Sequence, residues 1–398
     1  MKKHVILFLS VILITLLSCQ NSKKKKFGYS IKSKTFISIG KENGAGKASV
    51  LENDNFSLEV NVQPSKNVVQ HHDYGTDFLI EFSQKTGQVM KASFLKNKEP
   101  YFDYVSINGF YYAIHTDMNL MIGKIDSYLR KFDKNWKLIW SKRIEKSVFP
   151  DTKSHLIFTP QDQLLLVLDD HYGNEKIQET YLAILKYNLN GELITDKRFF
   201  KQELIRPELM IKTFDNNYVF SLLFGRDFTM DMLLVKVNSI GDTLWSKKFN
   251  DFNVEKALQL KDSSFLFFGY HYSLINNGAE QSQKLKVIKT DNNGNLLWQK
   301  TIKISKMDQV ADMFETDNGD YLFLSQISLK ENGGDFPFLI LINSSGKIIW
   351  YKLLTQSVGI FSSPTLLKVK DGFFLINGKS TKYGTFSRDI VLTKFIEN

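Results

Sequence analysis

Cysteine is almost absent from this chain, since Cys19 is the only one among 398 residues. No disulfide can therefore form within one copy of the protein. Proline is also scarce, at 7 residues, whereas phenylalanine and tyrosine number 32 and 16. Aromatic side chains suit the pleated, half-buried surface of a β-sheet. The composition therefore favours strands over helix-dominated packing.

Familiar catalytic motifs are missing as well. The sequence holds no G-x-S-x-G nucleophile elbow, no H-E-x-x-H zinc motif and no G-x-x-x-x-G-K-[ST] phosphate loop. Asp and Glu are scattered along the chain. A glycosidase or lyase with a pair of carboxylates stays open, because only the distance between the two groups in space defines such a site. No catalytic residue is predicted.

The long apolar run lies at the start of the chain, in MKKHVILFLSVILITLLSC, where Lys2 and Lys3 precede the stretch from Val5 to Leu17. This pattern is typical of a secretory signal, here residues 1–18. Its end, LLSC, resembles the bacterial lipobox. The resemblance implies that the peptide is cut before Cys19 and that this thiol receives a diacylglyceryl group, with acyl chains such as palmitate. An ordinary signal peptide with an incidental cysteine is the alternative.

Residues 19–28, CQNSKKKKFG, are predicted to form a lysine-rich tether. Two or three acyl chains and this basic run would anchor the protein stably in a membrane. Gln20 after the cysteine resembles lipoproteins sent to the outer membrane of Gram-negative bacteria, and the basic tether favours the periplasmic face. The formal net charge is +10, and six of the lysines lie in residues 1–28. The remaining body is only mildly basic, so no nucleic-acid partner is predicted.

The rest of the chain repeats one pattern, in which an apolar run, a turn ending in Gly and a second apolar run with Trp follow each other. Its clearest copies are DMLLVKVNSIGDTLWSKKF, KLKVIKTDNNGNLLWQKTI and FPFLILINSSGKIIWYKLL. Trp245, Trp298 and Trp350 lie 53 and 52 residues apart, and Trp140 lies 105 residues before Trp245. This spacing indicates a structural repeat with a constant period.

A second kind of hairpin, with turns such as Asn108-Gly109 and Asp371-Gly372, alternates with the first. Each period then contains four short strands, which is the content of one propeller blade. The predicted fold class is all-β, a single β-propeller over residues 29–398. Seven four-stranded blades fit the turns best, and six or eight are the alternatives. Residues 29–39 are expected to close the ring by pairing with the C-terminal blade.

These repeats resemble the β-propeller repeat of secreted bacterial proteins, and their Gly-to-Trp spacing is similar to that of the quinoprotein-type repeat. The resemblance covers residues 29–398. It implies the fold but no particular activity, because propellers serve as enzymes, scaffolds and ligand-binding proteins alike. Many quinoprotein dehydrogenases place two adjacent cysteines against the cofactor, and this chain cannot form that pair. No cofactor is predicted.

The repeated tryptophans have two interpretations. They form a stacking surface for sugars or a quinone, or they pack blades together with their N–H bonded to a neighbour. Recurrence at one blade position favours packing. His71 and His72 could bind a metal, but adjacent residues of a strand point to opposite faces and no third ligand follows. The turn at Asp291 lacks the Gly and Glu of a calcium loop. No metal site is predicted.

Polar residues also recur just after the expected second strand of successive blades. If the strands are radial, these side chains gather on one face or rim of the ring, where propellers usually bind ligands. They vary from blade to blade, as a binding surface requires and as unconstrained strand ends also would. The candidate ligand-face residues are His115, Asp170, His171, Arg226, His271, Gln326 and Lys379.

Three classes of function fit these observations. The first is a lipid-anchored envelope propeller that binds another envelope protein or a glycan, as the propeller lipoprotein of the outer-membrane assembly machinery serves as a scaffold. The second is an envelope enzyme acting on polysaccharide or peptide, for which paired carboxylates in a central pocket would be expected. The third is a structural or sensory spacer.

Overall fold

The computed structural model of the chain describes strands and tight turns separated by gaps. The described residues are 29–37, 42–50, 56–63, 76–83, 85, 89–95, 101–119, 124–134, 137–144, 155–159, 163–172, 179–202, 205–224, 231–275, 280–304, 308–330, 333–354, 364–380 and 388–397. The predicted signal, Cys19 and the tether lie outside these ranges, as do the His71-His72-Asp73 cluster and Arg226.

The described residues form seven antiparallel sheets of four strands each and no helix. In spatial order from one edge to the other, the sheets are β26 (Thr365–Val369), β27 (Gly372–Ser380), β28 (Arg388–Glu397) and β1 (Tyr29–Ile37); β2 (Glu42–Val50), β3 (Phe56–Gln63), β4 (Thr76–Phe82) and β5 (Val89–Leu95); β6 (Tyr101–Ile107), β7 (Phe110–Asn119), β8 (Lys124–Phe132) and β9 (Leu138–Ile144); β10 (His155–Thr159), β11 (Gln163–Tyr172), β12 (Glu179–Asn188) and β13 (Leu193–Gln202); β14 (Ile205–Lys212), β15 (Tyr218–Phe224), β16 (Asp231–Val237) and β17 (Thr243–Phe249); β18 (Asn253–Gln259), β19 (Phe265–Ile275), β20 (Glu280–Thr290) and β21 (Leu296–Ile302); and β22 (Asp308–Glu315), β23 (Tyr321–Lys330), β24 (Gly333–Ile342) and β25 (Ile348–Leu353).

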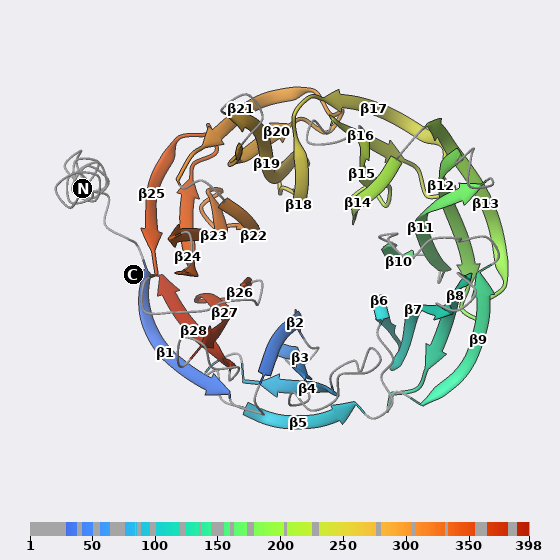
Figure 1. Cartoon of the computed structure of the whole chain (residues 1–398), viewed down its shortest axis with the longest axis horizontal. Helices are drawn as coiled ribbons and strands as arrows, with labels where there is room; N and C mark the ends of the chain where they lie inside the picture. The colour runs from blue at the N-terminus through green and yellow to red at the C-terminus, as the bar shows by residue number, and fades with distance from the viewer. Residues whose placement is uncertain are drawn as a thin grey trace.

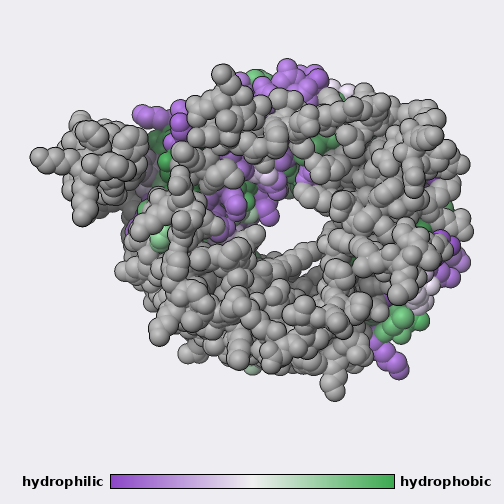
Figure 2. Space-filling view, viewed as in Figure 1, coloured by the Kyte–Doolittle hydropathy of each residue, from purple (hydrophilic) through white to green (hydrophobic). Residues whose placement is uncertain are grey.

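The sheets stand around a ring like the blades of a propeller, with the first strand of each blade innermost (Figure 1). The prediction of an all-β propeller is therefore confirmed. In the sheet that contains both the earliest and the latest strand, β1 takes the outermost place and pairs with β28, from Tyr29 opposite Glu397 to Ile37 opposite Ile390. Figure 2 shows that described hydrophilic residues reach an opening at the centre of the ring.

Two faces of the ring follow from the antiparallel order of the strands. In a four-stranded antiparallel blade, the turns after the first and third strands lie at one end, and the link after the second strand and the link to the next blade lie at the other. Turns of the first kind are short here, such as residues 213–217 and 291–295. We call their side of the ring the turn face and the opposite side the connection face.

The turn sequences explain the tightness of the hairpins. Gly294 has a φ of +76°, a conformation that a residue without Cβ adopts readily. Its N–H donates to the carbonyl oxygen of Asp291 at 3.1 Å. The Asp291 carboxylate accepts hydrogen bonds from the backbone N–H groups of Asn293 and Asn295, at 2.9 and 2.8 Å. The Asp and Asn residues of this turn therefore organise the hairpin itself.

The hydrophobic core lies between neighbouring blades. Phe268 of β19 meets Phe323 of β23 edge-on, with ring centroids 4.8 Å apart, inside a cluster that joins these two blades. On the other side of the same blade, Phe265 and Ile288 pack with Leu234 of β16. Alternate residues of one strand thus face the two neighbouring blades, as the two-residue period of a strand requires.

Trp245 and Trp298 connect their outer strands to the next blade. Nε1 of Trp245 donates to the carbonyl oxygen of Asn292 at 3.1 Å, and Nε1 of Trp298 donates to that of Ser344 at 3.0 Å. Both acceptors belong to the third-to-fourth-strand turn of the following blade. A Cβ placed on Gly294 would lie 2.9 Å from the Trp245 ring. Glycine in the turn therefore serves its φ angle and also makes room for the indole.

Trp140 in β9 and Trp350 in β25 occupy the same strand position. Trp140 lies edge-on to Tyr112, with centroids 6.1 Å apart, and its ring is within 2.8 Å of the position of a Cβ on Gly191 in the next blade. Trp350 packs against the cluster that contains Phe373 of the next blade. All four repeated tryptophans thus lie at junctions between blades.

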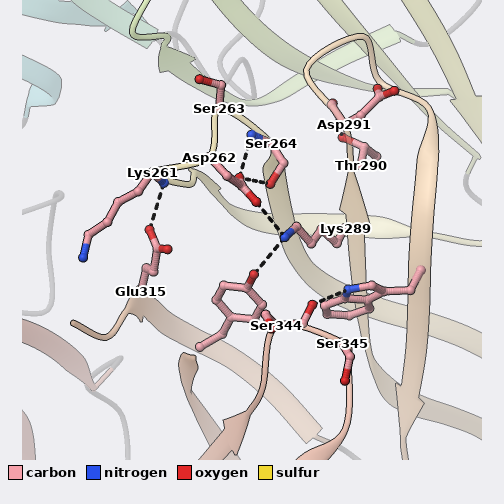
Figure 3. A network of polar contacts seen from close by, with 12 residues as sticks. Lys261, Asp262, Ser263, Ser264, Lys289, Thr290, Asp291, Glu315, Ser344 and Ser345 are labelled. Atoms are coloured by element: carbon pink, nitrogen blue, oxygen red, sulfur yellow. Dashed lines mark hydrogen bonds and ion pairs between the residues drawn. The ribbon is translucent and has the colours of Figure 1, made fainter. Parts of the chain in front are cut away.

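A buried lysine adds a polar contact at such a junction (Figure 3). Nζ of Lys289 donates to Asp262 in its own blade and to the hydroxyl of Tyr321 in the next blade, both at 3.0 Å. Burial acts to lower the pKa of Lys289, but the hydrogen bonds with Tyr321 and Asp262 outweigh it and raise the pKa above its ordinary value. The ammonium group therefore stays charged and joins two blades.

The same arrangement recurs at other junctions of the turn face. Nζ of Lys236 donates to Asp215 at 2.7 Å and to the side-chain oxygen of Asn292, in the next blade, at 3.0 Å. Nζ of Lys394 donates to Asp371 at 3.0 Å. In each case the carboxylate belongs to the first turn of the same blade as the lysine.

Candidate functional site

Six of the seven candidate ligand-face residues lie in the second strands of five different blades. The sequence analysis predicted these residues just after the second strands. They lie inside the strands instead, because the strands extend beyond their apolar residues. The placements are His115 in β7, Asp170 and His171 in β11, His271 in β19, Gln326 in β23 and Lys379 in β27. The side chains of His115, Asp170, His171 and Lys379 lie outside the described part of the structure, like Arg226.

The two candidates with described side chains differ in their surroundings. Gln326 is buried. It lies on the same strand side as Leu322 and Leu324, which pack toward the following blade. His271 is partly exposed and lines a pocket. The structure therefore brings His271, but not Gln326, to an accessible surface.

The pocket has a volume of about 380 Å³ and is open to solvent. It lies on the connection face, where the blade of β14–β17 meets the blade of β18–β21. Residues from one link and three adjacent strands form its lining: Asn250 and Asp251 before β18, His271 in β19, Lys286 in β20, and Gln299 and Thr301 in β21.

The strand register explains why these side chains share one wall. Lys286 is paired with Gly269 on one side and with Thr301 on the other. His271 and Gln299 lie two residues from these positions along their own strands, so they point to the same side of the sheet. This side faces the preceding blade, against which Ile288 is packed.

The link before β18 forms the opposite wall, and Gly269 allows its close approach. A Cβ on Gly269 would lie 1.9 Å from the carbonyl oxygen of Asn253 and 2.8 Å from the ring of Phe252. Asp251 has a φ of +51°, which is unusual for a residue with a side chain. This bend brings the Asp251 carbonyl oxygen to 3.3 Å from Nδ1 of His271, so Nδ1 donates there.

Lys286 is the central cation of the pocket. Its Nζ donates to the carbonyl oxygen of Asn250 at 3.4 Å and lies 5.4 Å from the centroid of the Phe252 ring. Burial lowers the pKa of Lys286 below its ordinary value, while the nearby carboxylate of Asp251 opposes that shift. The site therefore combines a half-buried ammonium, an imidazole and several neutral hydrogen-bonding groups.

The lining contains one carboxylate, Asp251. A glycosidase of the two-carboxylate type needs a second one nearby, and the described pocket residues do not supply it. Among the residues described, no three His, Cys, Asp or Glu side chains converge to hold a metal ion. Within the same residues, there is no helix with the length and apolar character needed to cross a membrane.

Sequence reasoning found His271 and missed the other five lining residues. One signal was present for Lys286. In the repeat, it occupies the position of Leu233, Ala183 and Phe338. Each of these lies three residues before the residue that is paired with the Trp or Thr of its own hairpin. A lysine at an otherwise apolar position marks a departure from the architecture. No such signal marks Asn250 and Asp251, because the links between blades do not repeat.

Comparison with known proteins gives the fold and no closer relationship. No family model matches the chain, and no curated protein matches it either. An ulvan lyase whose structure is described as a polysaccharide lyase bound to -[GlcA(1-4)Rha3S]- superposes with a TM-score of 0.52 at 8% identity, over 91% of this chain and 96% of that chain. The polysaccharide lyase Uly1 gives 0.50 at 8% identity, over 92% and 99%.

The β-propeller domain of the Trilobed protease from Pyrococcus furiosus is also similar, with a TM-score of 0.43 at 11% identity over 90% of this chain and 96% of that domain. At 8% identity, the likeness to the two lyases shows a shared fold alone, and one fold hosts many activities.

Proposed function

We propose that this chain is a lipid-anchored protein of the cell envelope whose propeller binds a glycan through the pocket on the connection face. The observation that carries the proposal is the lining of that pocket. Six polar residues converge there. A volume of about 380 Å³ lies within the usual range of ligand pockets, in which a few well-placed polar groups fix the orientation of the ligand.

The anchoring part of the proposal rests on the sequence of residues 1–28. A signal that ends at Cys19 and a lysine run directly after it would place the propeller on a short tether at a membrane. The outer membrane and its periplasmic face are the proposed location. Replacing Cys19 by Ser in the full-length chain should move the protein from the membrane to the soluble envelope fraction, and unchanged sedimentation with membranes would contradict the anchor.

Glycan binding is tested with the full-length chain in detergent micelles on a panel of envelope and extracellular polysaccharides. The double variant His271→Ala with Gln299→Ala should lose binding at least tenfold, because it removes two lining side chains from different strands. Lys300→Met is the matched control, since Lys300 is exposed and points to the other side of β21 from its neighbours Gln299 and Thr301. Equal losses in both variants, or no binding to any glycan, would refute the proposal.

The protein-binding alternative has a distinct outcome. Capture of one defined envelope protein by the anchored chain, at a surface insensitive to the His271 and Gln299 substitutions, would replace a glycan by a protein partner. Such a result would agree with a scaffold role for the rest of the connection face.

A lyase is the second candidate function, and the pairing of His271 with Lys286 in one pocket favours it. In β-elimination from a uronic acid, a base removes the C5 proton next to the carboxylate and the C4=C5 double bond forms as the C4–O glycosidic bond breaks. The protonated base then gives its proton to the leaving oxygen, and a cation neutralises the carboxylate. The imidazole of His271 is suited to the role of the base and the ammonium of Lys286 to that of the cation. The ultraviolet absorbance of an unsaturated product, formed by the wild type and not by Lys286→Met, would establish this activity.

A further inference from the structure

Lys286 differs from three buried lysines of the turn face in what neutralises its charge. Lys236, Lys289 and Lys394 each bind a carboxylate within 3.0 Å, while Lys186, also buried on the turn face, donates to the carbonyl oxygen of Ser239 at 2.9 Å. Among the described residues, Lys286 forms no ion pair, and its one hydrogen bond, to the Asn250 carbonyl, is long at 3.4 Å. Burying half of an ammonium group that no anion contacts directly is energetically unfavourable, and a bound anionic ligand would offset this penalty.

The surroundings of Lys286 fit a negatively charged ligand group. Lys284 lies two residues away on the same strand side and is paired directly with His271. The wall of β19 and β20 therefore carries two ammonium groups and an imidazole in a row. Asp251 is the one acidic residue in the lining.

Neighbouring acidic groups do not cancel this positive wall. Asp231 lies near the link, where its Oδ1 accepts a hydrogen bond from the backbone N–H of Asp251 at 3.3 Å. Its other oxygen forms an ion pair with Lys248 at 2.7 Å. Among the described residues, two lysines thus face one carboxylate without an ion pair, which gives this part of the surface a positive excess.

The remaining lining groups suit the hydroxyls of a sugar ring. Thr301 and Gln299 lie beside Lys286 on the outer strand, and the amide of Asn250 is on the opposite wall. Hydroxyl and amide groups both donate and accept hydrogen bonds. A ligand with one anionic group and several hydroxyls would use all of these partners together.

We propose that the pocket selects an acidic sugar, whose carboxylate or sulfate binds the ammonium of Lys286 while its hydroxyls bind the amide and hydroxyl groups of the lining. This inference rests on the proposed glycan-binding function and adds the chemical class of the ligand. Lys284 and His271 lie side by side on the same wall, so they extend this preference for an anionic group to the next sugar unit of the bound polysaccharide.

The test measures binding to the full-length protein in detergent by calorimetry. Three probes of equal length are compared: a neutral oligosaccharide, the same backbone oxidised to uronic acid, and the same backbone carrying sulfate. We expect the affinity for one of the two acidic probes to be about tenfold higher than that for the neutral probe, because one charge-assisted hydrogen bond contributes about this much. A preference for uronic acid over sulfate, or the reverse, identifies which anion the pocket takes.

Lys286→Met keeps the apolar stem and removes the charge, so it should abolish the preference, and the acidic and neutral probes should bind this variant with equal affinity. Lys286→Arg should retain the preference, and Lys300→Met should leave all three affinities unchanged. An unchanged melting temperature shows that each variant is folded. Equal affinity for acidic and neutral probes would overturn this inference and leave glycan binding intact, whereas no affinity for any probe would overturn both.

Discussion

On the turn face, neighbouring blades of the described structure repeat the same contacts, whereas on the connection face the described pocket lies between the blades β14–β17 and β18–β21 and has its own set of residues. The turn face uses a tryptophan, a turn glycine and a buried lysine at successive junctions. The pocket depends on the bent link at Asp251 and on Lys286, whose position in other repeats is held by Leu233, Ala183 and Phe338. Repetition in this molecule therefore marks stability, and departure from repetition marks the place to look for binding.

Two aspartates of the blade β14–β17 provide the most direct test of this difference between the two faces. Asp215 on the turn face and Asp231 toward the connection face each bind a lysine at 2.7 Å, but the Lys236 side chain is 4% exposed and that of Lys248 is 51% exposed. Asp215→Ala should lower the free energy of unfolding by about 3 kcal/mol, because it strands a buried charge. Asp231→Ala should cost about 1 kcal/mol or less. Chemical denaturation of both variants measures the difference, and equal losses would contradict the division of roles.

Two turn glycines with the same backbone angle provide the next test. Gly294 and Gly319 both have a φ of +76°, but a Cβ on Gly294 would meet the Trp245 ring at 2.9 Å, while nothing lies within 4 Å of a Cβ on Gly319. Gly319→Ala should cost about 1 kcal/mol from backbone strain alone. Gly294→Ala should cost about 1 to 2 kcal/mol more, because the indole must move. Thermal unfolding compares the pair, and a smaller loss for Gly294→Ala would show that the contact with the tryptophan is loose.

Acid titration gives a smaller effect on the same face. Burial acts to raise the pKa of Asp215, but hydrogen bonds from Lys236, Thr213 and Asn217 outweigh it and lower the pKa to about 2. Because the folded value is below the unfolded value of about 3.9, the ionised group stabilises the fold above pH 4, and this contribution is lost as the pH falls toward 2. The stability difference between wild type and Asp215→Asn should therefore shrink over that interval. A constant difference would mean that Asp215 keeps an ordinary pKa.

The smallest effect on stability is expected in the pocket. Lys286→Met should leave the melting temperature unchanged or slightly higher, because burial already disfavours the charge of Lys286. A marked destabilisation, comparable to that of Asp215→Ala, would show that Lys286 supports the architecture as Lys236 does. In that event the contrast between the two faces would disappear.

The sequence was sufficient to predict what the repeat encodes. The spacing of Trp245, Trp298 and Trp350 predicted the period because the tryptophans occupy the same strand position, and Trp245 and Trp298 each meet the same turn of the next blade. The lengths of the second strands were underestimated, since polar residues such as His271 and Lys379 continue the pairing beyond the apolar letters. Backbone hydrogen bonds extend a strand whatever its side chains are.

The sequence predicted only part of the pocket. His271 was among the candidates because polar residues recur at the ends of second strands. Asn250 and Asp251 come to it through a left-handed bend and through the missing side chain of Gly269, which permits two backbones to touch. This close approach depends on tertiary packing, so it cannot be predicted from the sequence of the link or from the sequence of the strand alone.

The pairing of β1 with β28 also has a kinetic consequence. Tyr29 is paired with Glu397, so this contact forms only after the intervening chain has been made and has folded into place. By the logarithmic dependence of loop entropy on length, closing this loop costs about 3 kcal/mol more than closing a hairpin of ten residues. Contacts of such long range slow folding. Ring closure is therefore expected to be a late step in folding, and hydrogen exchange along β1 would report how often the finished ring opens.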